Sequence, residues 1–281
     1  PEGTLIWSTY FGGNGGDYQN PQSNFNGSNS TGIIVSNNDL LYIYQQVKSE
    51  SLGTINTFQP NRLNANYLLS CFSFNGERIW STYYGINSST ITGITSTDNQ
   101  IIISGRTNDC PPNGSFNTYF ATPNCHQPFP GGCANSFVST FSLSGERNWS
   151  TYYGGTAPVR LIFKNILYSD NSLYFAGISS GNSTNISSFD SYQPESSGLS
   201  NFLVKFDSFG VRDWGTFVGT TPNASGGNSI ANVSKDIFGN LYLNGTTRLT
   251  QNIATNNAYQ ESLEGLHDGF IVKFNSIGER I

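Results

Sequence analysis

At 281 residues the chain is long enough to bury a large core in one domain or two. Only 11% of the residues are charged, against roughly 25% in an average soluble domain, so Ser, Thr, Asn and Gln must solvate the surface. The net charge of −5 and the 13 scattered Lys and Arg residues argue against a nucleic acid partner, whose phosphates need clustered cations. No apolar run reaches the ~18 residues that a membrane-spanning helix needs, so no membrane insertion is expected.

A motif built on tryptophan recurs along the chain. Trp-Ser-Thr-Tyr begins at Trp7, Trp80 and Trp149, and the related Trp-Gly-Thr-Phe begins at Trp214. A glycine-containing turn precedes the later copies, at 75–79, 144–148 and 209–213. The spacing of about 70 residues indicates a structural repeat, because self-similarity at a fixed period is typical of propellers and other arrays.

Each repeat carries four predicted strands. In the second repeat these are 91–95, 101–107, 137–143 and the strand of Trp149, separated by a turn, a long loop and a second turn. The first two strands of the other repeats are predicted at 33–35 and 40–44, 165–167 and 173–177, and 232–234 and 241–245. Short alternating runs between turn residues indicate an all-β fold. Four antiparallel strands per repeat predict the blade of a β-propeller, which hides strand edges by radial repetition.

The two ends of the sequence determine the predicted number of blades. Residues 3–13 have the pattern of a fourth strand, and the last repeat has only its first three strands before Ile281. We therefore expect one propeller domain over 1–281, with four blades at 14–86, 87–155, 156–220 and 221–281, the last completed by residues 1–13. A segment of a larger propeller is the alternative.

Several stretches resemble a known repeat family. The sequences at 149–155, 239–247, 257–260 and 268–275 resemble the bacterial β-propeller repeats known as SBBP, which are abundant in secreted proteins of Bacteroidota. The resemblance covers all four repeats. It implies a secreted or cell-surface protein that is similar to type IX secretion cargo, passes through secretion machinery, and belongs to a group with links to adhesion and gliding motility. The family is expected to have seven blades, whereas this sequence supplies four. A chain that begins at Pro1 and contains no Met fits a mature product from which any signal peptide is removed.

Long loops are expected on one face of the propeller and short turns on the other. The long stretches are 12–31, 48–66, 108–135, 179–200 and 248–268. Loops of about 20 residues are uncommon inside compact domains and are frequently functional. Tyr119, Phe120, Phe129 and His267 are the candidate ligand contacts, since exposed rings can stack on sugars or fill partner pockets. Alternatively, the aromatic residues form the interior of their own loop.

An aromatic ring followed by Gln occupies the same place in four loops. The pairs are Phe58-Gln59, His126-Gln127, Tyr192-Gln193 and Tyr259-Gln260. We interpret this aromatic–Gln motif as a plug whose Gln bonds to backbone, which makes His126 a packing residue. No zinc-ligand spacing, catalytic triad order or EF-hand pattern occurs, and carboxylates such as Asp17, Glu195 and Glu264 are too dispersed to form a pair. No metal, cofactor or catalytic residue is therefore predicted.

Three of the four cysteines share one loop. Cys110, Cys125 and Cys133 lie in 108–135, and in a secreted chain this clustering predicts a disulfide. We favour Cys110 with Cys133, because these residues lie near the two ends of the loop. Cys71 takes the position of Lys205 and Lys273 in other repeats, so a free thiol is expected there.

The leading functional prediction is a non-catalytic adhesion or binding module of the cell surface, which binds a protein or a glycan through the long-loop face. The first alternative is a glycan-cleaving hydrolase or lyase with a central cleft. The second is a structural spacer in a larger surface protein.

Overall fold

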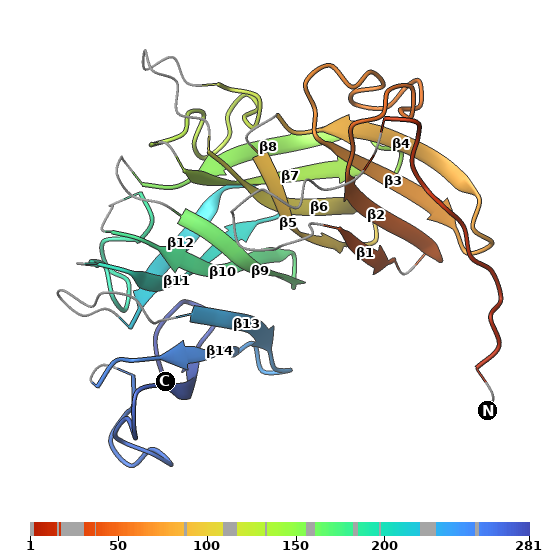
Figure 1. Ribbon diagram of the computed structural model, residues 1–281. Coiled ribbons are helices and arrows are strands. Elements are labelled where there is room, and N and C mark those ends of the chain that lie inside the picture. The colour runs from red at the N-terminus through yellow and green to blue at the C-terminus, as the bar shows by residue number, and fades with distance from the viewer. Residues whose placement is uncertain are drawn as a thin grey trace. The chain divides into compact units, whose positions relative to one another are not determined.

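The computed structural model describes residues 3–15, 17, 31–36, 38–86, 89–108, 117–132, 134–155, 161–181, 185–196, 198–219, 229–250 and 253–281. These residues form fifteen β-strands and no helix (Figure 1). The chain divides into two compact units. Unit 1 comprises Pro1–Ile103 and Ser139–Asn148, and unit 2 comprises Ser104–Val138 and Trp149–Ile281.

The strands form four antiparallel sheets in which successive strands lie side by side, with the orders β1-β2-β3-β4, β5-β6-β7-β8, β12-β11-β10-β9 and β13-β14-β15. A four-stranded meander of this kind is the blade of a β-propeller, so the predicted all-β propeller fold class is confirmed. The bounds are β1 Gly32–Val35, β2 Leu40–Gln46, β3 Tyr67–Ser73, β4 Arg78–Tyr84, β5 Ser89–Ser96, β6 Gln100–Thr107, β7 Asn135–Ser142, β8 Arg147–Tyr153, β9 Leu161–Ser169, β10 Ser172–Ser179, β11 Ser200–Asp207, β12 Arg212–Val218, β13 Ser229–Lys235, β14 Leu241–Thr247 and β15 Asp268–Phe274.

The core of unit 2 lies between two of these sheets. Side chains of β10, β11 and β12 pack against side chains of β13, β14 and β15, and the buried residues are mostly aliphatic and aromatic. They include Tyr174, Ala176, Leu203, Val218, Ile230, Val233, Leu241, Leu243, Phe270, Val272 and Phe274. Burial of apolar area between adjacent sheets is the main favourable contribution to this packing.

Each motif tryptophan contacts the turn of the following repeat. The indole Nε1 of Trp80 donates a hydrogen bond of 2.8 Å to the carbonyl of Leu143, and the ring lies against Gly145. The same pair of contacts joins Trp7 to Phe74 and Gly76, Trp149 to Ser208 and Gly210, and Trp214 to Ser276 and Gly278. All four glycines have a positive φ between +81° and +87°. The tryptophans therefore hold successive repeats together, and the turn must present a residue without Cβ.

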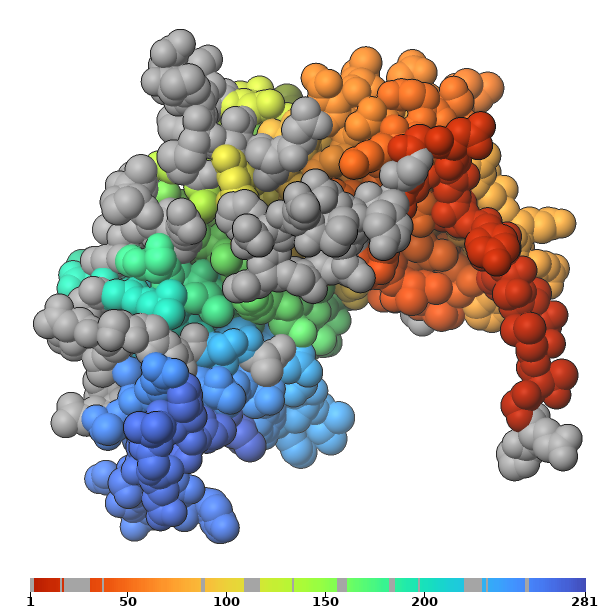
Figure 2. Space-filling model, in the orientation of Figure 1, coloured from red at the N-terminus to blue at the C-terminus, as the bar shows by residue number. Residues whose placement is uncertain are grey.

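The fourth strand expected for the last blade is not formed in the described residues. Residues 3–13 contain no strand, and the sheet of β15 has three strands. The segment is instead held by the first repeat, through the Trp7 contacts and through Phe11, whose ring meets Phe72 edge-on at a centroid separation of 5.0 Å. It stands at the surface of unit 1 (Figure 2, red). Residues 1–2 lie outside the described part.

Candidate functional site

The long loops are anchored to the fourth strand of their repeat by main-chain contacts at the aromatic–Gln motif. The backbone N of Gln59 donates to Thr82 Oγ1 at 2.8 Å, and the backbone N of Tyr83 donates to the carbonyl of Gln59 at 2.9 Å. The equivalent pairs join Gln127 to Thr151 and Tyr152, and Gln193 to Thr216 and Phe217. In these three repeats the motif therefore extends the sheet by a short stretch of loop.

The Gln side chain fixes the loop that follows it. The Nε2 of Gln59 donates to the carbonyl of Arg62 at 3.0 Å, Gln127 to Phe129 at 2.9 Å, and Gln260 to Ser262 at 2.8 Å. These bonds agree with the interpretation of the motif as a plug whose Gln bonds to backbone.

The aromatic ring of the motif faces the following repeat. The ring centroid of Phe58 lies 6.1 Å from the ring centroid of Phe141 and 4.4 Å from Cζ of the Arg147 guanidinium. In the same way, the ring centroid of Tyr192 lies 5.7 Å from the ring centroid of Phe274 and 5.5 Å from Cζ of Arg280. Contacts of this kind between a ring and a cation add to apolar packing. Phe58 and Tyr192 thus contribute to the packing between repeats.

His126 is the motif ring of the second repeat. Its ring lies 5.9 Å from that of Tyr153 and 5.6 Å from that of Phe206. Burial, together with the nearby Arg212, lowers the pKa of His126 from 6.5 to about 4. The imidazole is therefore neutral near pH 7 and packs as an aromatic ring, as the sequence predicted.

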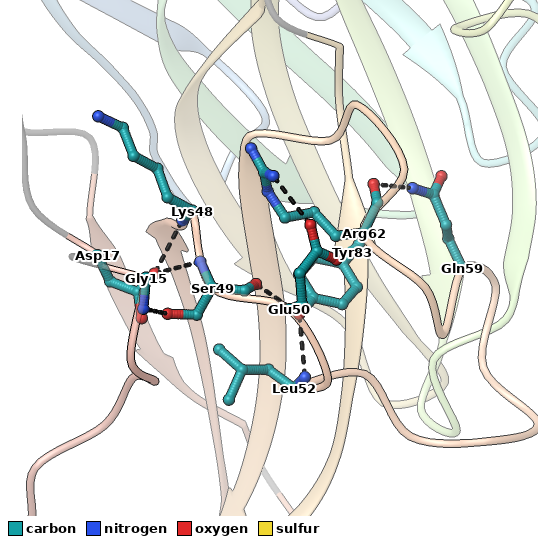
Figure 3. A network of polar contacts seen from close by, with 9 residues as sticks. All are labelled: Gly15, Asp17, Lys48, Ser49, Glu50, Leu52, Gln59, Arg62 and Tyr83. Atoms are coloured by element: carbon teal, nitrogen blue, oxygen red, sulfur yellow. Dashed lines mark hydrogen bonds and ion pairs between the residues drawn. The ribbon is translucent and has the colours of Figure 1, made fainter.

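A polar network fixes the 48–66 loop of unit 1 (Figure 3). The Asp17 carboxylate accepts from the backbone N of Gly13, Lys48 and Ser49 at 2.6, 2.8 and 2.7 Å. Burial opposes ionisation, but these hydrogen bonds outweigh it and hold the pKa of Asp17 below its ordinary value. Asp17, which the sequence analysis counted among carboxylates too dispersed to form a catalytic pair, thus accepts hydrogen bonds from the loop backbone.

Tyr83 of β4 also binds the 48–66 loop. The Tyr83 hydroxyl donates to the carbonyl of Ser49 at 2.8 Å and accepts from the backbone N of Leu52 at 2.9 Å, and Arg62 pairs with Glu50 at 3.1 Å (Figure 3). In unit 2 the hydroxyl of Tyr152, at the equivalent position, donates to the carbonyl of Asn117. A tyrosine of the fourth strand therefore anchors the described part of the loop in both cases.

The four predicted ligand residues differ in how exposed they are. Phe120 is fully buried and stacks on Phe137 at a centroid separation of 3.8 Å, so its assignment as a ligand contact is wrong: it forms the interior of its loop. Tyr119 is half-buried against Phe120. Phe129 is 56% exposed, and His267 is exposed, with its Nε2 accepting from Arg248 Nε at 2.8 Å. Phe129 and His267 lie in two different loops, 108–135 and 248–268.

Sequence reasoning missed several exposed apolar residues of the long loops. Ile55 and Phe189 are 78% and 98% exposed, and Leu63 is also exposed. Ile55 and Phe189 each lie three residues before the motif ring, at Phe58 and Tyr192. That shared repeat position is the signal that could have found them.

Two of the four cysteines, Cys71 and Cys125, lie in the part of the chain that the structure describes. Cys110 and Cys133, the predicted disulfide, lie outside the described residues. Cys71 is a buried free thiol and Cys125 a half-buried one. Within the described ranges, no group of three His, Cys, Asp or Glu residues could hold a metal ion, and no helix could span a membrane.

Comparison with known proteins gives structural likenesses alone. No family model matches the sequence, and no curated protein matches it. A protein of unknown function from Dyadobacter fermentans DSM 18053 is 13% identical with a TM-score of 0.43, and the match covers 89% of this chain and 66% of that one. An endosialidase of phage phi92 is 12% identical with a TM-score of 0.40, and the match covers 85% of this chain and 34% of that one. The chain therefore spans less than two thirds of each.

Proposed function

We propose that the protein is a non-catalytic binding module that uses the exposed apolar residues of its long loops to bind a protein partner. The observation that carries the proposal is the shared position of Ile55 and Phe189, three residues before an anchored aromatic–Gln motif. A loop that is already anchored by hydrogen bonds has less conformational entropy to lose when a partner covers its exposed apolar side chains.

The chemistry of these residues favours a protein over a glycan. Ile55 and Leu63 are aliphatic, and aliphatic side chains fill pockets on protein partners. A glycan is the second candidate ligand, supported by the exposed rings of Phe129 and Phe189, which could stack on sugars.

A secreted or cell-surface location and transit as type IX secretion cargo are part of the same proposal. Their support is the resemblance of the repeats to SBBP sequences and a surface that is solvated by uncharged polar residues. Adhesion, including adhesion that serves gliding, is the activity that such a module would perform.

The test measures binding of the purified protein to biotinylated surface proteins of the producing cell and, in parallel, to a glycan array. We expect Ile55→Ser and Phe189→Ser each to weaken protein binding at least fivefold, about 1 kcal/mol. Phe209→Ser is the matched control, because Phe209 is 81% exposed but lies in a short turn.

Equal losses for Phe189→Ser and Phe209→Ser would show that the long-loop residues are not the binding surface. Binding to neither probe would favour a structural spacer, and release of sugars from the array would favour a hydrolase or lyase.

A further inference from the structure

An arginine at the start of β12 connects two long loops. Arg212 donates from Nη1 to the carbonyl of Asn185 at 2.7 Å, which holds the beginning of the 185–196 segment. The arginine also pairs with Phe206 across β11 and β12. The ring of His126, from the preceding repeat, packs on Phe206 at a centroid separation of 5.6 Å. Arg212 therefore lies between the motif ring of one repeat and the loop of the next.

Equivalent arginines take the same place in other repeats. Arg280 binds the carbonyl of Ile253 in the long loop of its own repeat, and its guanidinium lies over the Tyr192 ring of the preceding repeat. Arg147 lies over the ring of Phe58 in the same manner. An uncharged ring attracts a cation to its face, so the arrangement is favourable with Phe or Tyr at the motif position.

The second repeat has a titratable ring at this position. Of the four motif rings, only that of His126 can carry a positive charge. Arg212 on β12 is the charged group of the described residues that acts on the imidazole; β8 contributes Tyr153, β11 contributes Phe206, and Cys125 precedes the ring in its own loop. Burial and Arg212 lower the pKa of the ring to about 4. A proton on the imidazole would place two cations together in a partly buried joint.

A second anchor of the 185–196 segment touches the same imidazole. The Tyr153 hydroxyl donates to the carbonyl of Ile186, and the ring centroids of Tyr153 and His126 lie 5.9 Å apart. The first two described residues of the segment, Asn185 and Ile186, are thus both held by neighbours of the imidazole. All of these residues belong to unit 2. Movement of the imidazole into water would therefore disturb both anchors.

The 185–196 segment covers the outer edge of β12, the last strand of its sheet. The backbone N of Phe217 donates to the carbonyl of Gln193 at 3.0 Å, and the backbone N of Gln193 donates to Thr216 Oγ1 at 2.9 Å. The same segment presents Phe189, which is 98% exposed. Release of the segment would expose the amide of Phe217 and remove the support of Phe189.

We propose that His126 and Arg212 form an acid-sensitive latch, which releases the 185–196 segment when the imidazole is protonated. In the latched form the neutral ring packs on Phe206 beside Arg212. In the released form the imidazolium is hydrated, and Arg212 has left the carbonyl of Asn185. The released form takes up a proton that the latched form excludes. Acidification from pH 6.5 towards pH 4 therefore raises the ratio of released to latched protein, by at most about tenfold per pH unit.

The latch makes partner binding through Phe189 weaker at acidic pH, a consequence that rests on the proposed function. Release of the segment itself needs no partner, so it is tested on the protein alone. A protein that binds through Phe189 without a latch, and one that has the latch but does not bind, then give different results.

Hydrogen exchange measured by NMR at pH 7 and pH 4.5 tests the latch. The backbone amide of Phe217 is the reporter, because its acceptor lies in the 185–196 segment. We expect its protection factor to fall at least fivefold more in the unmodified protein than in His126→Phe, which carries the ring that Phe58 supplies in the first repeat. Arg212→Gln removes the positive charge but keeps an amide donor, and it should also show a smaller fall than the unmodified protein.

Equal falls in the unmodified protein and in His126→Phe overturn the proposal. A full fall in Arg212→Gln does so as well, because repulsion between the two cations would then play no part. Repeating the exchange in dilute urea separates release from unfolding, since local opening depends little on urea. If the Phe217 amide at pH 4.5 has the urea dependence of the amides of β11, the central strand, unit 2 unfolds as a whole and no latch exists.

Discussion

Trp149 lies flat against Gly210, so closely that a Cβ added to the glycine would come within 2.7 Å of the indole. The glycine also has a φ of +85°, which L side chains rarely adopt. Two independent demands, one conformational and one steric, therefore fall on the same residue.

Gly210→Ala should be more destabilising than a matched glycine substitution elsewhere. Gly239 has a similar φ of +87°, but the nearest atom to its added Cβ is 3.8 Å away. The left-handed backbone costs either alanine roughly 1–2 kcal/mol. The contact with Trp149 should add at least about 1 kcal/mol to the loss at Gly210. Urea unfolding of the two variants measures the difference in unfolding free energy. Equal losses of unfolding free energy would show that the Trp149 ring can move away from the added Cβ without an energetic penalty.

Removal of the Thr151 hydroxyl should loosen the loop that follows Phe120. The Oγ1 atom accepts from the backbone N of Gln127 at 2.9 Å and donates to the carbonyl of Tyr152 at 3.0 Å. Thr151→Val should cost about 1–3 kcal/mol, because the amide of Gln127 loses its acceptor. Thr151→Ser keeps the hydroxyl and should recover most of the loss. Hydrogen exchange at Gln127 should accelerate only in the valine variant, and a similar acceleration in the serine variant would contradict this role.

The stability of unit 2 should depend on the protonation of His126. Its pKa is lowered from 6.5 to about 4 by burial and by Arg212, so the folded protein favours the neutral ring. This contribution is fully present above pH 6.5 and is lost as the pH falls from 6.5 towards 4, because the unfolded chain binds the proton more strongly. After allowance for solvent screening of a partly exposed group, the loss should be about 1–2 kcal/mol.

His126→Phe is the control for this pH dependence, since Phe58 holds the equivalent place in the first repeat. The variant should lose less unfolding free energy between pH 7 and pH 4 than the unmodified protein does. Parallel curves for the two proteins would assign the pH dependence to other groups.

Cys71 should resist alkylation in the folded protein. The thiol is fully buried, and burial raises its pKa to about 11, against a smaller opposing effect of the hydrogen bond with Tyr42. Iodoacetamide should therefore label Cys125 much faster than Cys71 at pH 8, because the thiolate is the reactive form. Peptide mapping after timed labelling measures both rates. Labelling of Cys71 at the rate seen in urea would place the thiol at the surface.

The repeated strands could be predicted from sequence because their signals are local. Alternation and glycine turns located β6 and β10 to within one or two residues, and the repeated tryptophans showed that one design recurs. The partner of Trp80 could not be found in this way, because Gly145 lies in the following repeat and no local pattern joins the two.

The ligand residues were harder to predict, because burial inside a loop depends on what the loop folds against. Phe120 and Phe129 look alike in sequence, yet Phe120 stacks on Phe137 of β7 and Phe129 points to solvent. In contrast, Phe189 could have been identified by comparing its position with that of Ile55 in the first repeat.

The tryptophan-to-glycine contact constrains how such a chain can lengthen. The first three repeats each place an indole against the turn of the next repeat, at Gly145, Gly210 and Gly278, so both halves of the contact are copied whenever one full period is duplicated. If the duplicated segment is a whole number of repeats long, each tryptophan still faces a glycine turn, wherever in the repeat the segment begins. One that copies a fraction of a period leaves a ring facing a side chain. Gene duplication in whole periods is therefore the route of growth that this packing tolerates.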